Sequence, residues 1–313
     1  MTPAIDGIEY TKFITQNPNV TRGIVFAGCS FTWGQGLYYY SNLPSIREPQ
    51  PNHFERALVN SSHIQFMESV RMPRLVANHF KTFEAVHPYN GGSDESILDF
   101  WERAFDPARK PFMHNHHRHM NDDGIFSVSD PWYDYDDFAY IVYQFTQLER
   151  TRFKFQLRGK TYHFNVHYAR NGSQGTPEEM NAFIEWLLEQ EMTYEQWQDL
   201  HHRQITQRVK RFLQNFEMNG VKARVTVWPY DGLKYVEEDA WLKERLVQFK
   251  YLNNDYNSYT TLMEVPEMKI DTDTRHFKVT PGDHHPSLMA QQVVADALIR
   301  SMDSTYIHRP RYE

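Results

Sequence analysis

The chain has 313 residues, of which 40% are hydrophobic and 15% aromatic, so it has enough apolar side chains for a large core and does not resemble a disordered chain. Its 33 basic and 40 acidic residues give a net charge of −7, which argues against a nucleic-acid partner, because nucleic-acid-binding proteins need a basic excess to neutralise phosphates. No apolar run approaches the roughly 18 residues of a membrane helix, and no signal peptide is visible. The single cysteine allows no intrachain disulfide. We therefore expect a soluble, cytoplasmic protein without a membrane partner.

In the first half of the chain, predicted strands alternate with predicted helices. Each strand is a short apolar run, and each helix repeats apolar residues at intervals of three or four. The strands are expected over 23–28, 83–88 and 138–145, and the helices over 65–80 and after Ser93. Pro73 is expected to kink the first helix, and Ser93 to cap the second.

The second half begins with a predicted hairpin over 153–169, with its turn at Arg158–Gly159–Lys160. The segment Thr176–Pro177–Glu178–Glu179 is typical of a helix start, because a capping residue is followed by proline and acidic residues. The remaining elements are a helical region up to 219–220, broken near Met192–Thr193, a fourth strand over 223–228 and a last helix over 287–301.

This alternation predicts an α/β fold with a mainly parallel central sheet and helices on both faces. We expect a single domain over 1–313, in which 105–136 and 151–175 are insertions without a second core. In open parallel sheets, ligands bind beyond the carboxyl ends of the strands, and three segments at such ends carry suggestive residues.

The first segment is Gly28–Gly36, directly after the first strand. Ser30 lies there between glycines, on a tight turn that suits an exposed nucleophilic hydroxyl with backbone N–H groups beside it. The alternative is a glycine-rich turn in which Ser30 only caps a helix.

The second segment is Gly282–Ser287, before the last helix. Asp283 and His285 lie two residues apart, so in an extended segment the carboxylate can orient the imidazole as a general base. The alternative is an ordinary helix start with Ser287 as its cap. The third segment, Asn90–Gly91–Gly92–Ser93, suits close approach of backbone N–H groups to a developing oxyanion, or is a simple strand-to-helix turn.

Taken in order, the three segments resemble the SGNH (GDSL-type) hydrolase superfamily, including divergent members associated with phage and bacterial proteins. The resemblance implies a three-layer α/β/α sandwich of the flavodoxin-like kind and hydrolysis of an ester, often an acyl group on a carbohydrate or lipid. We expect no cofactor and no metal. The resemblance implies Ser30 as nucleophile, His285 as base and Asp283 as its partner. It also implies that the backbone N–H groups of Ser30 and Gly92 stabilise the oxyanion.

Two departures from the family pattern stand out. Cys29 replaces the acid that usually precedes the serine, and the Gly-x-Asn-Asp block expected after the third strand is missing from residues 145–150. Thr146, Gln147 or Asn90 is then expected to supply the third oxyanion donor. Because the loss of one such donor costs about a hundred- to a thousandfold in rate, the alternative is a catalytically inactive protein that binds a glycan or a protein, or serves as a phage accessory component.

Other residues have both a functional and a structural interpretation. Trp33 and Tyr38 either stack on sugar rings or pack a loop, as do Trp132, Tyr133 and Tyr135. Arg150 either binds an anionic substrate or forms ion pairs. The histidine-rich run over 114–119 is expected to be a solvated loop in preference to a metal site, and His201–His202 is expected at the surface. The sequence makes no prediction of the oligomeric state.

Overall fold

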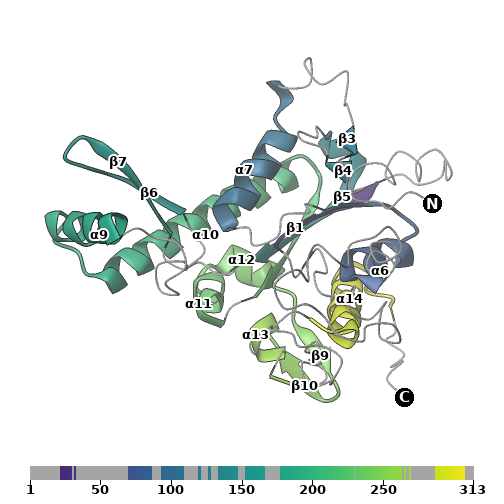
Figure 1. Ribbon diagram of the computed structural model, residues 1–313. Coiled ribbons are helices and arrows are strands. Elements are labelled where there is room, and N and C mark those ends of the chain that lie inside the picture. Colours follow the sequence, from purple (N-terminus) through teal and green to yellow (C-terminus); the bar gives the residue numbers. More distant parts are fainter. Residues whose placement is uncertain are drawn as a thin grey trace, which may run out of the picture.

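A four-stranded parallel sheet forms the centre of the molecule (Figure 1). The computed structural model describes residues 22–29, 32, 70–86, 93–108, 119–120, 126–127, 133–146, 152–165, 177–228, 230–262, 264–265, 268 and 286–306. The sheet has the order β2-β1-β5-β8, formed by β1 (Gly23–Ala27), β2 (Glu84–Val86), β5 (Phe138–Phe145) and β8 (Lys222–Val227). β1 and the second half of β5 are fully buried, which explains why both consist of apolar and aromatic residues, with Gln144 as the exception in β5. The predicted parallel α/β sheet is confirmed.

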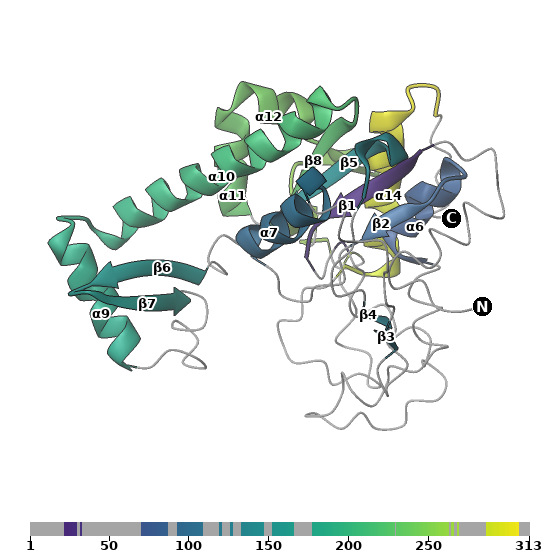
Figure 2. The ribbon, with the colours of Figure 1, turned by 90° about the horizontal axis from the view of Figure 1, so that it is seen from above.

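Helices cover both faces of this sheet. α6 (Met72–His79) connects β1 to β2, whereas α7 (Asp94–Ala104) and α10 (Tyr194–Met218) lie in connections that run the other way along the sheet. Because crossovers between parallel strands are right-handed, connections in opposite directions place their helices on opposite faces. α14 (Leu288–Met302) packs beside α6. Figures 1 and 2 show α6 and α14 on one face and α7 and α10 on the other, so the predicted three-layer sandwich is confirmed.

The helix ends follow local capping rules, with one correction. Ser93 and Ser287 cap α7 and α14 by accepting backbone N–H groups, as their sequences predict. Val70 is helical and Arg71 is extended, so the helix predicted over 65–80 is interrupted at Arg71, and Pro73 lies in the first turn of α6, after the interruption. Proline fits there because the N–H groups of a first turn have no partner within the helix. The correction is therefore a break just before Pro73 in place of a kink at Pro73.

Beyond β8, the structure contains short elements that the sequence did not predict. They are α11 (Tyr230–Glu238), α12 (Ala240–Arg245), β9 (Phe249–Tyr251), β10 (Asn254–Tyr256) and α13 (Tyr259–Leu262). Leu246 forms a parallel bridge with Val225, and the N–H of Val247 donates to the Val225 carbonyl at 2.8 Å. Among the described residues, the outer edge of β8 therefore pairs with this one isolated bridge and with no further strand.

The predicted hairpin belongs to a separate lobe. β6 (Arg152–Leu157) and β7 (Lys160–Asn165) are joined by Arg158 and Gly159, both with positive φ, as expected for a two-residue turn. We call β6, β7, α9 (Pro177–Glu189) and the first turns of α10 the hairpin lobe; Figure 2 shows it projecting from the sheet at the start of α10. Its buried side chains form a cluster apart from the main core: Phe155, Leu157, Phe164, Ala182, Phe183, Leu187 and Trp197.

The expectation that the insertion has no core of its own was therefore wrong. Aromatic residues of the hairpin are buried against α9 and Trp197 instead of against the sheet. His201 and His202 were also wrongly expected at the surface, since they are 6% and 4% exposed. The description of 1–313 as one domain stays a prediction.

The loop over 105–136 contains little regular structure in its described residues: β3 (His119–Met120), β4 (Phe126–Ser127) and the 3₁₀ turn η2 (Tyr135–Asp137). Tyr133 and Tyr135 pack against Phe105 and the main core, which favours the structural interpretation of these two tyrosines. Among the helices in the described part of the chain, none has both the length and the hydrophobicity that a membrane crossing requires.

Candidate functional site

The strand order marks one place in the sheet where a site is expected. β1 and β5 are neighbours, yet the helices that follow them, α6 and α10, lie on opposite faces. Connections that leave neighbouring strands towards opposite faces open a crevice at the carboxyl ends of those strands. The turn after β1 and the end of β5 therefore lie at the position where this type of fold binds its ligands.

The turn after β1 is held by a buried glutamine. Gln144 Oε1 on β5 accepts the Thr32 hydroxyl at 2.6 Å, the Cys29 N–H at 3.3 Å and the Cys29 thiol at 3.5 Å. A Cβ on Gly28 would lie 2.1 Å from Thr32 Oγ1 and 2.8 Å from Gln144 Oε1, so only glycine fits there. We call Gly28–Thr32 the nucleophile turn, because Ser30, between Cys29 and Thr32, is the predicted nucleophile.

The orientation of the Gln144 amide follows from its partners. A backbone N–H can only donate, so the atom facing Cys29 is the amide oxygen. Gln144 Nε2 is buried and has no hydrogen-bond partner among the described residues. Gln144 is 1% exposed in a strand that is otherwise apolar at this end, so its polarity is not explained by contact with water.

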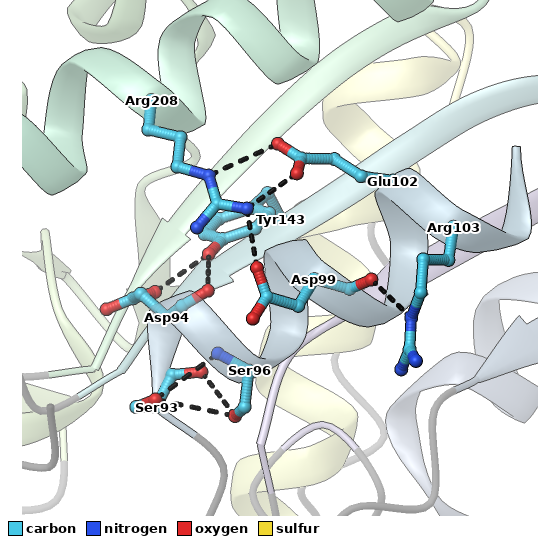
Figure 3. Close-up of polar contacts among 8 residues, drawn as sticks. All are labelled: Ser93, Asp94, Ser96, Asp99, Glu102, Arg103, Tyr143 and Arg208. Atoms are coloured by element: carbon cyan, nitrogen blue, oxygen red, sulfur yellow. Dashed lines mark hydrogen bonds and ion pairs between the residues drawn. The ribbon is translucent and has the colours of Figure 1, made fainter. Parts of the chain in front are cut away.

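A second buried polar group lies at the start of α7 (Figure 3). Asp94 is 1% exposed and accepts the Tyr143 hydroxyl at 2.9 Å. Its carboxylate also accepts the Thr146 N–H at 3.2 Å and the Thr146 hydroxyl at 3.3 Å. Burial, and then the Asp94 carboxylate, hold the pKa of Tyr143 well above its usual range, so Tyr143 remains a donor.

Thr146 was expected as a possible third oxyanion donor. It is fully buried, and both its N–H and its hydroxyl donate to Asp94. A threonine hydroxyl has one proton, and here that proton serves Asp94 and not a ligand. In this structure, Thr146 therefore supports the start of α7.

The helix that begins with Asp94 is also fixed from its outer side. Arg208 on α10 binds Asp99 at 2.6 Å and Glu102 at 2.5 Å, and both carboxylates belong to α7 (Figure 3). Ser93 Oγ accepts the Ser96 N–H at 3.3 Å and caps the helix. The segment that follows Gly92 is therefore attached to both β5 and α10.

The start of α14 lies at the same edge of the sheet. The end of this helix is at the opposite edge, where the Met302 carbonyl accepts the Tyr140 hydroxyl near the beginning of β5 at 3.1 Å. At its start, Gln291 Oε1 accepts the N–H of Met72, the first residue of α6, at 2.7 Å. Since α6 follows β1, this contact places the start of α14 at the carboxyl edge. Ser287 comes two residues after His285.

Most of the predicted site residues lie outside the described residues: Ser30, Trp33, Tyr38, Asn90, Gly92, Gln147, Arg150, Asp283 and His285. Described residues next to them in the sequence are Cys29, Thr32, Ser93, Thr146 and Pro286. The positions of the predicted catalytic groups themselves stay predictions.

The contacts of Gln144 and Asp94 were not predicted from the sequence. The one available signal for Gln144 was a single amide within the apolar run Phe138–Phe145. In the described residues, no group of three or more histidine, cysteine or carboxylate side chains is arranged to hold a metal ion.

Comparison with known proteins gives a similarity in overall fold at low sequence identity. No protein-family model and no curated protein matches the chain. One similar solved structure is a carbohydrate esterase whose active site displays divergent catalytic and non-catalytic binding functions. The TM-score is 0.44 and the sequence identity 14%, and the match covers 92% of this chain and 70% of that one.

Another is an acetyl xylan esterase from the rumen bacterium Butyrivibrio proteoclasticus, with a TM-score of 0.42 and 16% identity over 91% of this chain. This chain spans 64% of the length of that enzyme. At these TM-scores and identities, the similarity assigns neither catalytic residues nor a substrate to this chain.

Proposed function

We propose that the chain is a serine ester hydrolase of the SGNH type. The observation that supports this most is that three described residues, each next to or near a predicted site residue, lie at the carboxyl edge of the sheet. Cys29 next to Ser30, Ser93 next to Gly92, and Ser287 near His285 all belong to elements that begin or end at this edge. A nucleophile, an oxyanion donor and a base require such a convergence of distant segments.

In the proposed reaction, the Ser30 hydroxyl attacks the ester carbonyl while His285 takes its proton, oriented by Asp283. The negative charge that develops on the carbonyl oxygen is stabilised by the backbone N–H groups of Ser30 and Gly92. Protonated His285 then donates its proton to the leaving alcohol. A water molecule attacks the acyl-enzyme by the same route and releases Ser30.

The third oxyanion donor is assigned by elimination. Since the Thr146 hydroxyl serves Asp94, we propose the side-chain amide of Asn90 or Gln147 for this role. Trp33 and Tyr38 are proposed to stack on a sugar ring of the substrate, and Arg150 to bind its polar groups. The substrate class is accordingly an acylated carbohydrate, and we propose the cytoplasm as the location on the basis of the single cysteine.

The alternative is an inactive relative that binds a glycan or a protein, or serves as a phage accessory component. The absence of the Gly-x-Asn-Asp block favours it, because that block supplies an oxyanion donor in the family that the chain resembles. The two proposals differ in whether ester turnover depends on Ser30.

We predict that Ser30→Ala lowers the kcat for hydrolysis of p-nitrophenyl acetate by roughly a thousandfold or more, because it removes the nucleophile. A serine at the opposite edge of the sheet offers a matched control: Ser301, at the end of α14, should tolerate Ser301→Ala with unchanged turnover. Equal turnover by wild type and Ser30→Ala, measured over several acyl lengths, would refute the enzyme proposal and favour the binding protein.

A further inference from the structure

We infer that the carboxyl end of β5 acts as a brace that sets the spacing between the nucleophile turn and the segment before α7. We call Tyr143, Gln144 and Thr146 the β5 brace. This inference rests on the proposed function, because that function places the nucleophile on one side of the brace and an oxyanion donor on the other.

The first arm of the brace is Gln144. One amide oxygen accepts three donors from the nucleophile turn, two of them from Cys29, the residue before Ser30. A leucine would fill this buried position without burying an amide, and Gln144 Nε2 has no partner among the described residues. A leucine would, however, leave the Cys29 N–H and the Thr32 hydroxyl without this acceptor, so glutamine holds the turn although its own unsatisfied N–H costs about 1–3 kcal/mol. Departures of this kind are expected at functional sites.

The second arm of the brace is formed by Tyr143 and Thr146, which hold Asp94. Three donors converge on its carboxylate from the end of β5. Asp94 is also the first residue of α7, where the partial positive charge of a helix start favours a carboxylate. The contacts fix the chain two residues after Gly92, the predicted oxyanion donor.

The two arms are joined by a very short stretch of strand. Gln144 and Thr146 are two residues apart, which corresponds to about 6.6 Å of extended chain. An oxyanion hole works only when its donors lie about 2.7–3.1 Å from the developing charge, and a misplacement of about 1 Å can cost a hundredfold in rate. A rigid strand with hydrogen bonds to both segments is suited to keep this spacing.

One substitution tests each arm of the β5 brace. Gln144→Met keeps the side-chain volume but removes the acceptor, and Tyr143→Phe removes one donor to Asp94. With an acetyl ester as substrate, each should lower kcat by about tenfold to a hundredfold and change KM less than twofold, because the brace positions reacting groups without touching the substrate. Tyr306→Phe is the matched control: it removes a tyrosine–aspartate bond to Asp296, at the other end of α14, and should leave kcat and KM unchanged.

A second readout does not depend on activity. The chain has one cysteine, and Cys29 on the nucleophile turn is fully buried, so its reaction rate with dithionitrobenzoate reports opening of that turn. Gln144→Met should raise this rate at least tenfold, whereas Tyr143→Phe, on the other arm, should not change it. Gln291→Met, at another buried glutamine, shows how much rate increase follows from lost stability alone.

The outcomes separate this inference from the proposed function. An active wild type whose kcat and Cys29 rate are both insensitive to Gln144→Met would overturn the brace and leave the esterase proposal intact. A wild type without esterase activity would refute the proposed function, and an unchanged Cys29 rate in Gln144→Met would then overturn the brace as well.

Discussion

Two neighbouring histidines on α10 are buried against aromatic side chains. The His201 ring stacks on Trp197 with a centroid distance of 5.4 Å, and the His202 ring meets Tyr235 edge-on at 5.1 Å. Burial lowers the pKa of each to about 4. For His202, the nearby His201 and Lys234 lower the pKa further, and Asp199 opposes them. Both imidazoles are therefore neutral in the folded protein at neutral pH.

This burial predicts a loss of stability in mild acid. An unfolded chain protonates these histidines near pH 6.5, but the folded protein does so only near pH 4, so the unfolded state binds more protons between these values. The free energy of unfolding should be highest above pH 6.5 and fall as the pH drops towards 4, by on the order of 3 kcal/mol per histidine.

Urea unfolding at pH 7.5 and pH 5.0 measures the effect. The double variant His201→Phe, His202→Phe keeps aromatic rings at both positions and should lose most of the difference between the two pH values. A difference as large as that of the wild type would show that other groups cause it.

Single residues were predictable where their role is local. Ser93 and Ser287 cap helices because of their immediate neighbours, and the capping contacts are present. Gln144 was not predictable, because the residue whose N–H it accepts lies 115 positions away in the sequence. The burial of His201 was not predictable for the same reason, because one of its aromatic neighbours, Phe153, comes from another element of the hairpin lobe.

At the scale of elements, long or strongly apolar segments were predicted and short ones were not. β1 and β5 are recognisable because both faces of a central parallel strand are buried. α11, α12 and the small strands beyond β8 are at most nine residues long, so each spans too few repeats of an apolar pattern to be recognised. The hairpin was predicted, but not its packing, because the partner helix α9 follows it after a separate stretch of chain.

The hairpin lobe should lose its structure without affecting the sheet. Trp197 is 4% exposed and contacts Phe153 and Phe183 in the lobe core, which is separate from the main core. Trp197→Ala should therefore destabilise the lobe by about 3–5 kcal/mol. Hydrogen exchange measured by mass spectrometry should speed up in 152–165 and 177–200 and stay unchanged in β1 and β5.

Trp241→Ala on α12 is the matched control, since Trp241 lies in the main body beneath the Arg245 guanidinium. It should leave exchange in the lobe unchanged. Faster exchange throughout the sheet in Trp197→Ala would mean that the lobe and the main core unfold as one unit.

At the scale of the whole molecule, the alternation of strands and helices was sufficient to predict three layers. It also predicted the edge of the sheet at which the site is expected, because parallel strands all end on one side. The support beneath the site was not predictable, because it depends on which side chains of β5 face the nucleophile turn and α7. Gln144 and Asp94 became apparent only from those contacts.

We propose that a serine near the beginning of the chain is activated by a histidine near its end. Labelling with a fluorophosphonate, followed by peptide mapping, tests this activation, because an activated serine displaces fluoride from the reagent and retains the phosphonyl group. We expect one labelled residue, Ser30, in the wild type and in Ser301→Ala, and much slower labelling in His285→Ala. A label at another residue, or labelling that persists in Ser30→Ala, would contradict the proposal.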